Sequence, residues 1–479
     1  MERVKGSGKP LSAMVLKALG LFGSVQMLNI LLGIVRTKLV VVWLGAAGVG
    51  LFAIYNSVLT LVSTFSQMNL RTSAVREVAG AGSDAEASGM IYVVRRWSLW
   101  LGLLGLVAMA AAAPVFSIRT FGSLGETLPL MALGVAVLFM TLGNGEQVAL
   151  QGRGLLKPLA SSSMWGTVGG VALTVGLIWW LRDDGIVPSL VGGSVMTWLA
   201  VRWHTRRLPV PECGLSARET WDKGVPMVRL GLYMTLAYVM AELFNYIFIT
   251  YLTHRGGVDG VGYFQAGFTI MNRYVGMVFM AIGVEFYPRL STVVSSRRCT
   301  SMYVSHETLL LCVILLGGLT LLTPFIPLVI DILYSADFHV AEPMIYLGFP
   351  ALVLRALTMC MSYVILARGD GKAYVVTEVI SEAVLLGLNI WFYDMWGLGG
   401  LGVASIINFL AYLGIVSPWY FGKYGLTVAR RVVMAVAGTF AAVLGAGVLA
   451  LTVHPAAALA VAIPSVAISL RSLRKFLRK

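Results

Sequence analysis

Residues 432–451 read VVMAVAGTFAAVLGAGVLAL, a run without a single charged side chain. About 20 consecutive apolar residues form a helix long enough to span the hydrocarbon core of a bilayer. Similar runs, separated by charged or Gly/Pro-rich breaks, recur along the chain and predict about fourteen membrane helices. They lie near residues 11–44, 48–70, 91–113, 126–149, 158–180, 186–203, 228–251, 261–287, 305–330, 343–366, 373–394, 398–420, 430–452 and 455–470.

The composition excludes a soluble enzyme. Only 12% of the 479 residues are charged and 58% are hydrophobic, whereas a soluble domain has about 25% charged residues. Such a chain lacks the charged residues needed to cover soluble cores. Its cysteines are far apart and have no CxxC spacing, which predicts neither a disulfide framework nor a metal site. They are Cys213, Cys299, Cys312 and Cys360.

The basic residues predict the orientation in the membrane. In an apolar chain, a formal net charge of +14 indicates loops that face an anionic inner leaflet rather than a nucleic acid partner. Most Lys and Arg residues fall on alternate helix ends, which would be cytoplasmic. These include Arg95, Arg96, Arg206, Arg207, Arg297, Arg298, Arg430, Arg431, Arg471, Arg474, Lys475, Arg478 and Lys479, and the basic lead-in Arg3, Lys5 and Lys9. The opposite ends carry Arg119, Arg182 and Arg255, so both termini are predicted to be cytoplasmic.

Two short patterns occur twice at nearly constant separation. Gly48-Val49-Gly50-Leu51-Phe52 recurs as Gly260-Val261-Gly262-Tyr263-Phe264, and Arg153-Gly154 with Lys157 recurs as Arg368-Gly369 with Lys372. Two copies of a six-helix unit explain both matches, and an even helix number inserts both copies the same way up. The sequence therefore predicts an all-α polytopic membrane protein with two pseudo-symmetric six-helix lobes and two C-terminal helices. The predicted parts are an N-terminal lobe (1–203), a cytoplasmic linker (204–227), a C-terminal lobe (228–420), and two extra helices with a basic tail (421–479).

Several charged residues fall inside the predicted helices. A charge at the bilayer centre costs about 2.5–3.5 kcal/mol on the insertion scale, so it needs a partner, water or a function. The cations are Arg36, Lys38, Arg273 and Arg355. In one interpretation, Glu242–Arg273 and Arg355–Glu382 are salt bridges between neighbouring helices. That interpretation leaves out Arg36 and Lys38, for which it names no acidic partner.

The second interpretation is a cationic, water-filled cavity between the lobes that binds an anionic head group. Arginine suits a phosphate because its planar guanidinium forms bidentate hydrogen bonds. The substrate-binding candidates are therefore Arg36, Lys38, Arg273 and Arg355. The acids Glu242, Glu378 and Glu382 are either salt-bridge partners or proton or sodium sites that drive transport, because a carboxylate in a low dielectric titrates at raised pH.

One glycine motif is misleading. Residues 397–402 spell GxGxxG, but a dinucleotide site needs a strand before this motif and a soluble βαβ unit around it. Here the motif falls in the short outer loop between two predicted spans. Together with the scattered histidines, this predicts no cofactor and no metal.

Residues Leu32-Gly33-Ile34-Val35-Arg36, with Leu44-Gly45 and Gly48-Val49-Gly50-Leu51-Phe52, resemble the polysaccharide flippases of the MOP superfamily. These are the Wzx-type O-antigen translocases and, more distantly, the lipid II flippases. The resemblance implies transport of an undecaprenyl-diphosphate-linked saccharide through a cationic cavity. Arg36 matches the arginine of an Arg-Asp pair in the first helix of the lipid II flippases, but Thr37 replaces the acid. Arg273, ahead of Pro288-Arg289-Leu290, loosely fits a second family arginine, and residues 430–470 match two extra helices that hold the lipid tail in the lipid II branch.

We therefore expect an inner-membrane flippase for a polyprenyl-diphosphate-linked oligosaccharide, an O-antigen or related repeat unit, and no enzymatic activity. Its expected partners are this lipid-linked glycan, the bilayer and other glycan-assembly proteins, and not nucleic acid. The first alternative is a cation-coupled multidrug exporter of the same superfamily, whose cavity would be rich in carboxylates and aromatics. The second is a glycan polymerase or glycosyltransferase, which usually needs a larger outer loop than 331–342.

Overall fold

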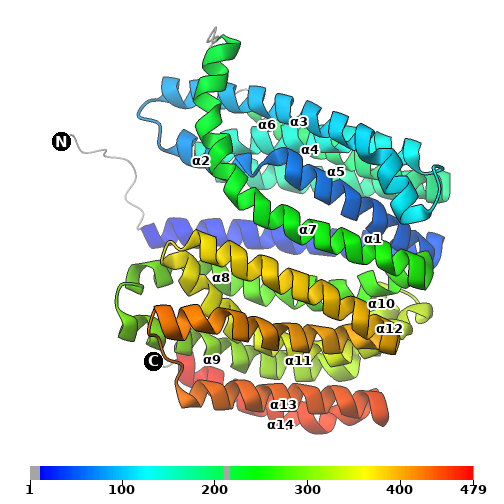
Figure 1. Cartoon of the computed structure of the whole chain (residues 1–479), viewed down its shortest axis with the longest axis vertical. Coiled ribbons are helices and arrows are strands. Elements are labelled where there is room, and N and C mark those ends of the chain that lie inside the picture. Colours follow the sequence, from blue (N-terminus) through cyan, green and yellow to red (C-terminus); the bar gives the residue numbers. More distant parts are fainter. Residues whose placement is uncertain (1–10, 207, 209–215, 478–479) are drawn as a thin grey trace. The chain divides into compact units, whose positions relative to one another are not determined.

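The computed structural model describes residues 11–206, 208 and 216–477, and within them every regular element is helical. Ten helical stretches in this part of the chain are long and apolar enough to cross a membrane. The chain is therefore a multi-pass membrane protein of the all-α class, as predicted. It forms two compact units, Met1–Glu242 and Leu243–Lys479, which are coloured from blue to green and from green to red in Figure 1.

The first unit contains six complete α-helices and the beginning of a seventh. They are α1 (Leu11–Gln67), α2 (Leu70–Ala79), α3 (Asp84–Phe121), α4 (Thr127–Gly152), α5 (Leu156–Leu181), the short η1 (Arg182–Gly185), α6 (Ile186–Thr205) and the start of α7 (Ala217–Phe268). The start of α7 is fixed to α3 within this unit: Trp97 donates to the carbonyl of Thr220 at 3.0 Å and stacks on Trp221.

The second unit holds the remaining helices. They are η2 (Thr269–Tyr274), α8 (Gly276–Val293), α9 (Arg297–Leu322), η3 (Thr323–Phe325), α10 (Ile326–Leu333), η4 (Ala336–Ala341), α11 (Glu342–Ala367), α12 (Gly371–Ser417), η5 (Pro418–Lys423), α13 (Arg430–Thr452), η6 (Pro455–Ala458) and α14 (Leu459–Leu477). The last two α-helices pack within this unit. Ser469 of α14 donates to the carbonyl of Val313 in α9 at 2.6 Å, and Gly447 of α13 lies against the carbonyl of Tyr346 in α11.

The internal repeat is also present in the backbone. Gly45 (φ 65°, ψ −156°) breaks α1 and Gly257 (φ 68°, ψ −179°) breaks α7, each just before one copy of the repeated Gly-Val-Gly. Gly154 and Gly369, the glycines of the repeated Arg-Gly, both have positive φ, of 68° and 77°. Because only glycine adopts such a backbone at no steric cost, the repeated glycines mark repeated turns.

A third pair of turns has a glycine in one copy and an arginine in the other. Gly397 (φ 58°, ψ −142°) interrupts α12, and Arg182 (φ 54°, ψ −128°) has nearly the same backbone at the turn after α5. The two positions are separated along the chain by about as many residues as the other pairs. Arginine has a Cβ that is strained in this region, at a cost of about 1–3 kcal/mol.

Replacing Arg182 with glycine is therefore expected to stabilise the protein by about 1 kcal/mol and to raise its melting temperature. Arg182→Ala is the matched control, because it removes the charge and keeps the strained Cβ. Thermal melts of the purified proteins in detergent would compare the two. If alanine raised the melting temperature as much as glycine, the gain would come from the side chain and not from the backbone.

The predicted number of membrane helices and the predicted linker remain predictions. The breaks at Gly45, Arg182, Gly257 and Gly397 fall between predicted spans, but the count of fourteen goes beyond the ten stretches above. Residues 207 and 209–215 of the predicted linker 204–227 lie outside the described residues, and the linker is helical from 217 onward. The basic lead-in and the end of the basic tail also lie outside the described residues. The GxGxxG motif is helical from residue 398 onward, and Gly402 packs against the backbone of Met344 and Gly348 in α11.

Candidate functional site

Arg273 lies in η2, a single π-helical turn between the end of α7 and α8. Such insertions are rare and often occur at functional sites. The side chain is exposed, although the helical stretch around it, Tyr238–Val293, is apolar enough to cross a membrane. Within the described residues of its own unit, Arg273 forms no ion pair or hydrogen bond. The turn thus presents a guanidinium that has no carboxylate partner in that unit.

Arg355 lies on α11, a helix whose side chains are mostly buried within the second unit. Its guanidinium donates to Asn272 Oδ1 at 3.1 Å and lies 5.0 Å from the ring centre of Phe279. Glu382 acts electrostatically on Arg355, and the predicted salt bridge between them stays a prediction. Asn272 lies on the adjacent π-helical turn, directly before Arg273 in the chain. Its neutral amide leaves the charge of Arg355 in place.

Glu378 and Glu382 lie one turn apart on the first limb of α12, as predicted from their spacing. Both carboxylates are close enough to Arg355 to act on it electrostatically. Tyr412, on the second limb of the same helix, donates a hydrogen bond to Glu378. The break at Gly397 folds α12 back on itself and so brings these two limbs together.

A second polar pair extends this cluster. The side-chain amide of Asn408 contacts Ser381 Oγ at 3.5 Å, and its Oδ1 is buried with no hydrogen-bond partner in the described part of the chain. The cluster therefore contains carboxylate, hydroxyl and amide oxygens where the two limbs of α12 face each other. Hard cations such as Na⁺ and protons both bind to oxygen ligands of this kind.

The candidate residues of the first unit lie on α1 and α7. Arg36 is half-buried on α1, with its guanidinium carbon 5.0 Å from the ring centre of Phe52, and Lys38 is half-buried two residues later. Glu242, the last residue of this unit, is half-buried on α7. The predicted Glu242–Arg273 pair joins residues of different units and stays a prediction.

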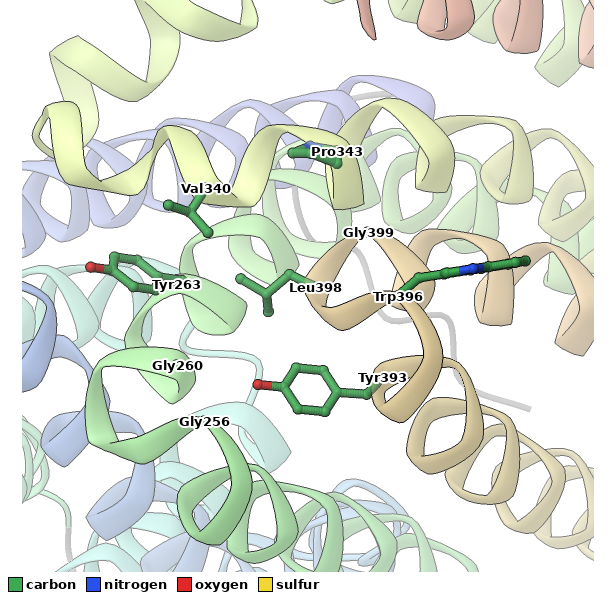
Figure 2. A pocket seen from close by; sticks show the side chains of 9 residues that line it. All are labelled: Gly256, Gly260, Tyr263, Val340, Pro343, Tyr393, Trp396, Leu398 and Gly399. Carbon is green, nitrogen blue, oxygen red and sulfur yellow. The ribbon is translucent and has the colours of Figure 1, made fainter.

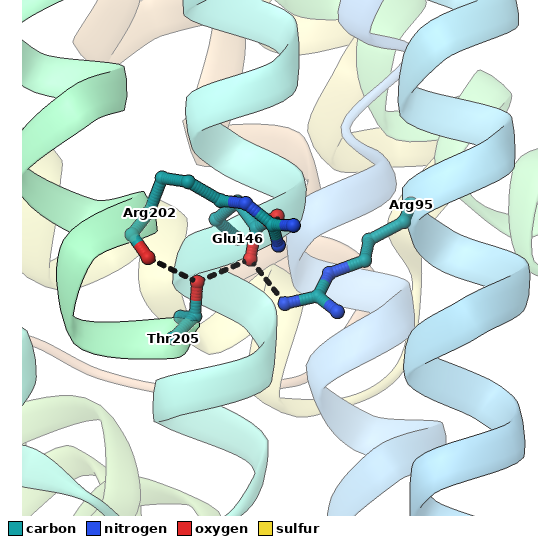
Figure 3. Close-up of polar contacts among 4 residues, drawn as sticks. All are labelled: Arg95, Glu146, Arg202 and Thr205. Carbon is teal, nitrogen blue, oxygen red and sulfur yellow. Dashed lines mark hydrogen bonds and ion pairs between the residues drawn. The ribbon is translucent and has the colours of Figure 1, made fainter. Parts of the chain in front are cut away.

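Sequence reasoning missed a buried ion cluster in the first unit. Glu146 of α4 is 6% exposed and accepts from Arg95 of α3 at 2.6 Å, from Arg202 of α6 at 2.8 Å and from Thr205 at 2.6 Å (Figure 3). The three helices meet at their basic ends. One carboxylate therefore joins α3, α4 and α6 and partly neutralises two arginines.

Glu146→Gln is expected to lower the stability of the first unit by about 2–3 kcal/mol, because charged hydrogen bonds are lost and Arg95 is left without its counter-ion. The loss stays below the full value for a buried pair, since Arg202 is 44% exposed. Glu285→Gln is the matched control, because Glu285 pairs with Arg289 at 2.6 Å on the surface and such pairs contribute at most about 1 kcal/mol. Equal decreases in melting temperature for the two variants would contradict the structural role of Glu146.

The turn between α11 and α12 is fixed by a surface ion pair. Asp370 accepts from Lys423 and from the hydroxyl of Tyr424, and it caps α12 at Ala373. The Lys423 ammonium is the main reason that the pKa of Asp370 is lowered. Arg368, from the repeated Arg-Gly pattern, lies over the ring of Tyr424. This end of the unit is therefore stabilised by contacts that the first copy lacks, since Leu155 follows Gly154 where Asp370 follows Gly369.

Solved structures with a similar fold are transporters. The chain is similar to the lipid II flippase MurJ in an inward closed conformation, with a TM-score of 0.66 and 13% identity, over 96% of this chain and 100% of that one. It is also similar to an inward-facing multidrug resistance MATE family transporter of the MOP superfamily, with a TM-score of 0.63 and 19% identity, over 86% of this chain and 95% of that one. At these identities the likeness establishes the fold.

Sequence comparison gives the family. The chain is 21% identical to the lipid III flippase of Escherichia coli (strain K12) over 399 residues, which is 80% of this chain and 92% of that protein. The lipid III flippase of Shigella flexneri matches to the same extent. A family model described as "Polysaccharide biosynthesis protein" matches residues 15–294, more than half of the chain. The chain therefore belongs to the polysaccharide biosynthesis protein family.

Proposed function

We propose that this protein is a flippase that moves an undecaprenyl-diphosphate-linked oligosaccharide from the cytoplasmic to the outer leaflet of the bacterial inner membrane. The cargo would be an O-antigen or a related repeat unit. Family membership and the similarity to a lipid III flippase along 80% of the chain support a lipid-linked cargo. Both termini would be cytoplasmic, as the basic helix ends predict.

The observation that carries this proposal is the pair Arg273 and Arg355. One guanidinium is exposed and lacks an ion pair in its unit, and the other is held by a neutral amide. A charge in a membrane-spanning segment that lacks an ion pair is costly, so the exposed Arg273 favours an anionic ligand. A diphosphate supplies two phosphate groups that accept bidentate hydrogen bonds from arginine.

Arg36 and Lys38 are the proposed contributors from the first unit. No covalent step is required of any of these residues: the transporter only has to bind its cargo differently in its inward- and outward-facing states. The predicted lobes, 1–203 and 228–420, would alternate between these states, and helices α13 and α14 would contact the lipid tail. Other glycan-assembly proteins would supply the cargo and receive it.

The energy source is proposed to be a cation gradient acting on α12. Glu378, Tyr412 and the unpartnered Asn408 Oδ1 form an oxygen-rich cluster within reach of Arg355. Glu382 on the same limb and Glu242 on α7 are the other coupling candidates. Loading a proton or Na⁺ here would change the charge next to the phosphate-binding arginine, which links cation binding to cargo binding.

The test is translocation of a fluorescent undecaprenyl-diphosphate saccharide in proteoliposomes that contain the purified protein. The proposal expects the label to reach the opposite leaflet faster than in protein-free liposomes, and excess unlabelled lipid-linked saccharide to compete. Uptake of an organic cation such as ethidium, without transport of the lipid-linked saccharide, would instead establish the multidrug exporter. Elongation or transfer of the saccharide would indicate the polymerase or glycosyltransferase.

A further inference from the structure

A cavity of about 410 Å³ opens at one end of the second unit (Figure 2). It is bordered by the break in α7, the start of α11 and the break in α12. Three aromatic residues line it, Tyr263, Tyr393 and Trp396, together with Gly256, Gly260 and Leu398. Its volume falls within the range of about 300–1,000 Å³ that is usual for small-molecule sites. All of these breaks are predicted outer turns, so this end of the unit would face away from the cytoplasm.

The chemistry of the lining selects a neutral ligand. None of the described residues that line the cavity is charged. The described charges around it include no unpaired cation: Arg255, next to Gly256, lies 3.5 Å from Asp394, which follows Tyr393 and accepts a hydrogen bond from Tyr251. The acids Asp259 and Asp337 act on Tyr263. On the opposite side, His339 contacts both Asp331 and Glu342. The rim thus offers hydrogen-bonding groups without an excess guanidinium to hold a phosphate.

The aromatic residues are specific to the second copy of the repeat. The first copy has Leu51 where the second has Tyr263 in the repeated Gly-Val-Gly pattern. It also has Leu181 before the turn at Arg182, where the second copy has Trp396 before Gly397. The turns themselves therefore do not require aromatic rings, which here pack on Phe338 and Phe392 and border the cavity. Trp396 is 57% exposed, so its ring is accessible at the edge of the cavity.

We infer that this cavity binds a pyranose ring of the translocated saccharide at the outer end of the protein. The C–H face of a sugar ring packs on aromatic surface, and its hydroxyls bond to the tyrosine hydroxyls and to the paired side chains of the rim. Gly256 lets the Tyr393 hydroxyl approach α7, since a Cβ there would lie 2.4 Å from it, and a Cβ at Gly260 would have only this hydroxyl within 4 Å, at 3.8 Å. The inference rests on the proposed function for the source of the sugar, and it adds a sugar subsite to the diphosphate site at Arg273 and Arg355.

The full-length protein in nanodiscs would be tested by saturation-transfer NMR with a panel of methyl glycosides and N-acetylhexosamines. We expect at least one sugar to bind and Trp396→Ala to weaken its binding at least tenfold. Trp391→Ala is the matched control: it lies on the same helix, is 60% exposed and, like Trp396, packs on Phe392, but it does not line the cavity. Gly260→Leu is a second variant, which fills the cavity from α7 and keeps all three aromatic rings.

The outcomes separate this inference from the proposed function. If the wild type translocates the lipid-linked saccharide but no sugar binds, or binding survives both Trp396→Ala and Gly260→Leu, the subsite is wrong and the flippase stands. If sugars bind in the predicted way but no lipid-linked saccharide moves, the proposed function fails and the sugar site stands. Binding of tetraphenylphosphonium in place of sugar, lost in Trp396→Ala, would overturn the subsite in favour of a cation site on the aromatic rings.

Discussion

Arg273→Ala is expected to slow translocation of an undecaprenyl-diphosphate saccharide about 100-fold while leaving membrane insertion and stability unchanged. Two charge-assisted hydrogen bonds to a phosphate contribute about 3 kcal/mol together, and each 1.4 kcal/mol corresponds to a factor of ten. Stability should not fall, because the side chain is exposed and forms no ion pair or hydrogen bond within the described residues of its unit. Initial rates in proteoliposomes, normalised to reconstituted protein, would measure the effect.

Two further variants make this test specific. Arg273→Lys keeps the charge but loses the planar fork, so an intermediate loss of about tenfold is expected. Arg298→Ala is the control, since Arg298 is another exposed arginine of the same unit but lies in the first turn of α9. A rate for Arg273→Ala equal to that of the wild type would remove this residue from the binding site. An equal decrease for Arg298→Ala would indicate a general effect of positive charge.

The helices and their turns were predictable because each depends on a local property of the chain. An apolar run sets the length of a membrane helix, and glycine permits the backbone of Gly45, Gly257 and Gly397. The beginnings of α3 and α9 also depend on a local residue: Ser83 and Ser296 each accept a hydrogen bond from a backbone N–H in the first turn of the helix. Arg182 is the exception: its backbone matches that of Gly397 although its residue type gives no sign of it.

The partners of the charged residues were not predictable. Nothing in the sequence indicated that the Arg355 guanidinium bonds to Asn272, or that Glu146 joins Arg95 and Arg202. Choosing a partner requires the rotation of each helix about its axis. A soluble helix reveals that rotation by its polar stripe, whereas a membrane helix is apolar on both its lipid-facing and its protein-facing side. The π-helical turn that contains Asn272 also rotates the residues after it about the helix axis, and no periodic sequence pattern predicts that rotation.

Glu378→Gln is expected to abolish the response of transport to an imposed cation gradient and to leave cargo binding intact. Glutamine has nearly the shape of the protonated acid but neither gains nor loses a proton, so the coupling step would be fixed in one state. For one coupled proton, a gradient of one pH unit provides about 1.4 kcal/mol, which is roughly a tenfold bias in rate. The measurement is the ratio of translocation rates with and without an imposed pH or Na⁺ gradient: up to about ten is expected for the wild type and one for Glu378→Gln.

Tyr412→Phe separates the carboxylate from the hydrogen bond that orients it. This variant removes the donor to Glu378 and keeps the acid itself, so the response to the gradient should persist while the pH of half-maximal transport moves. Glu382→Gln, one turn along the same limb, tests which of the two acids near Arg355 carries the cation. If the wild type ignored both gradients, neither acid would be a coupling site. If Glu382→Gln alone lost the response, the site would lie one turn further along α12, and Glu378 would serve to position Tyr412.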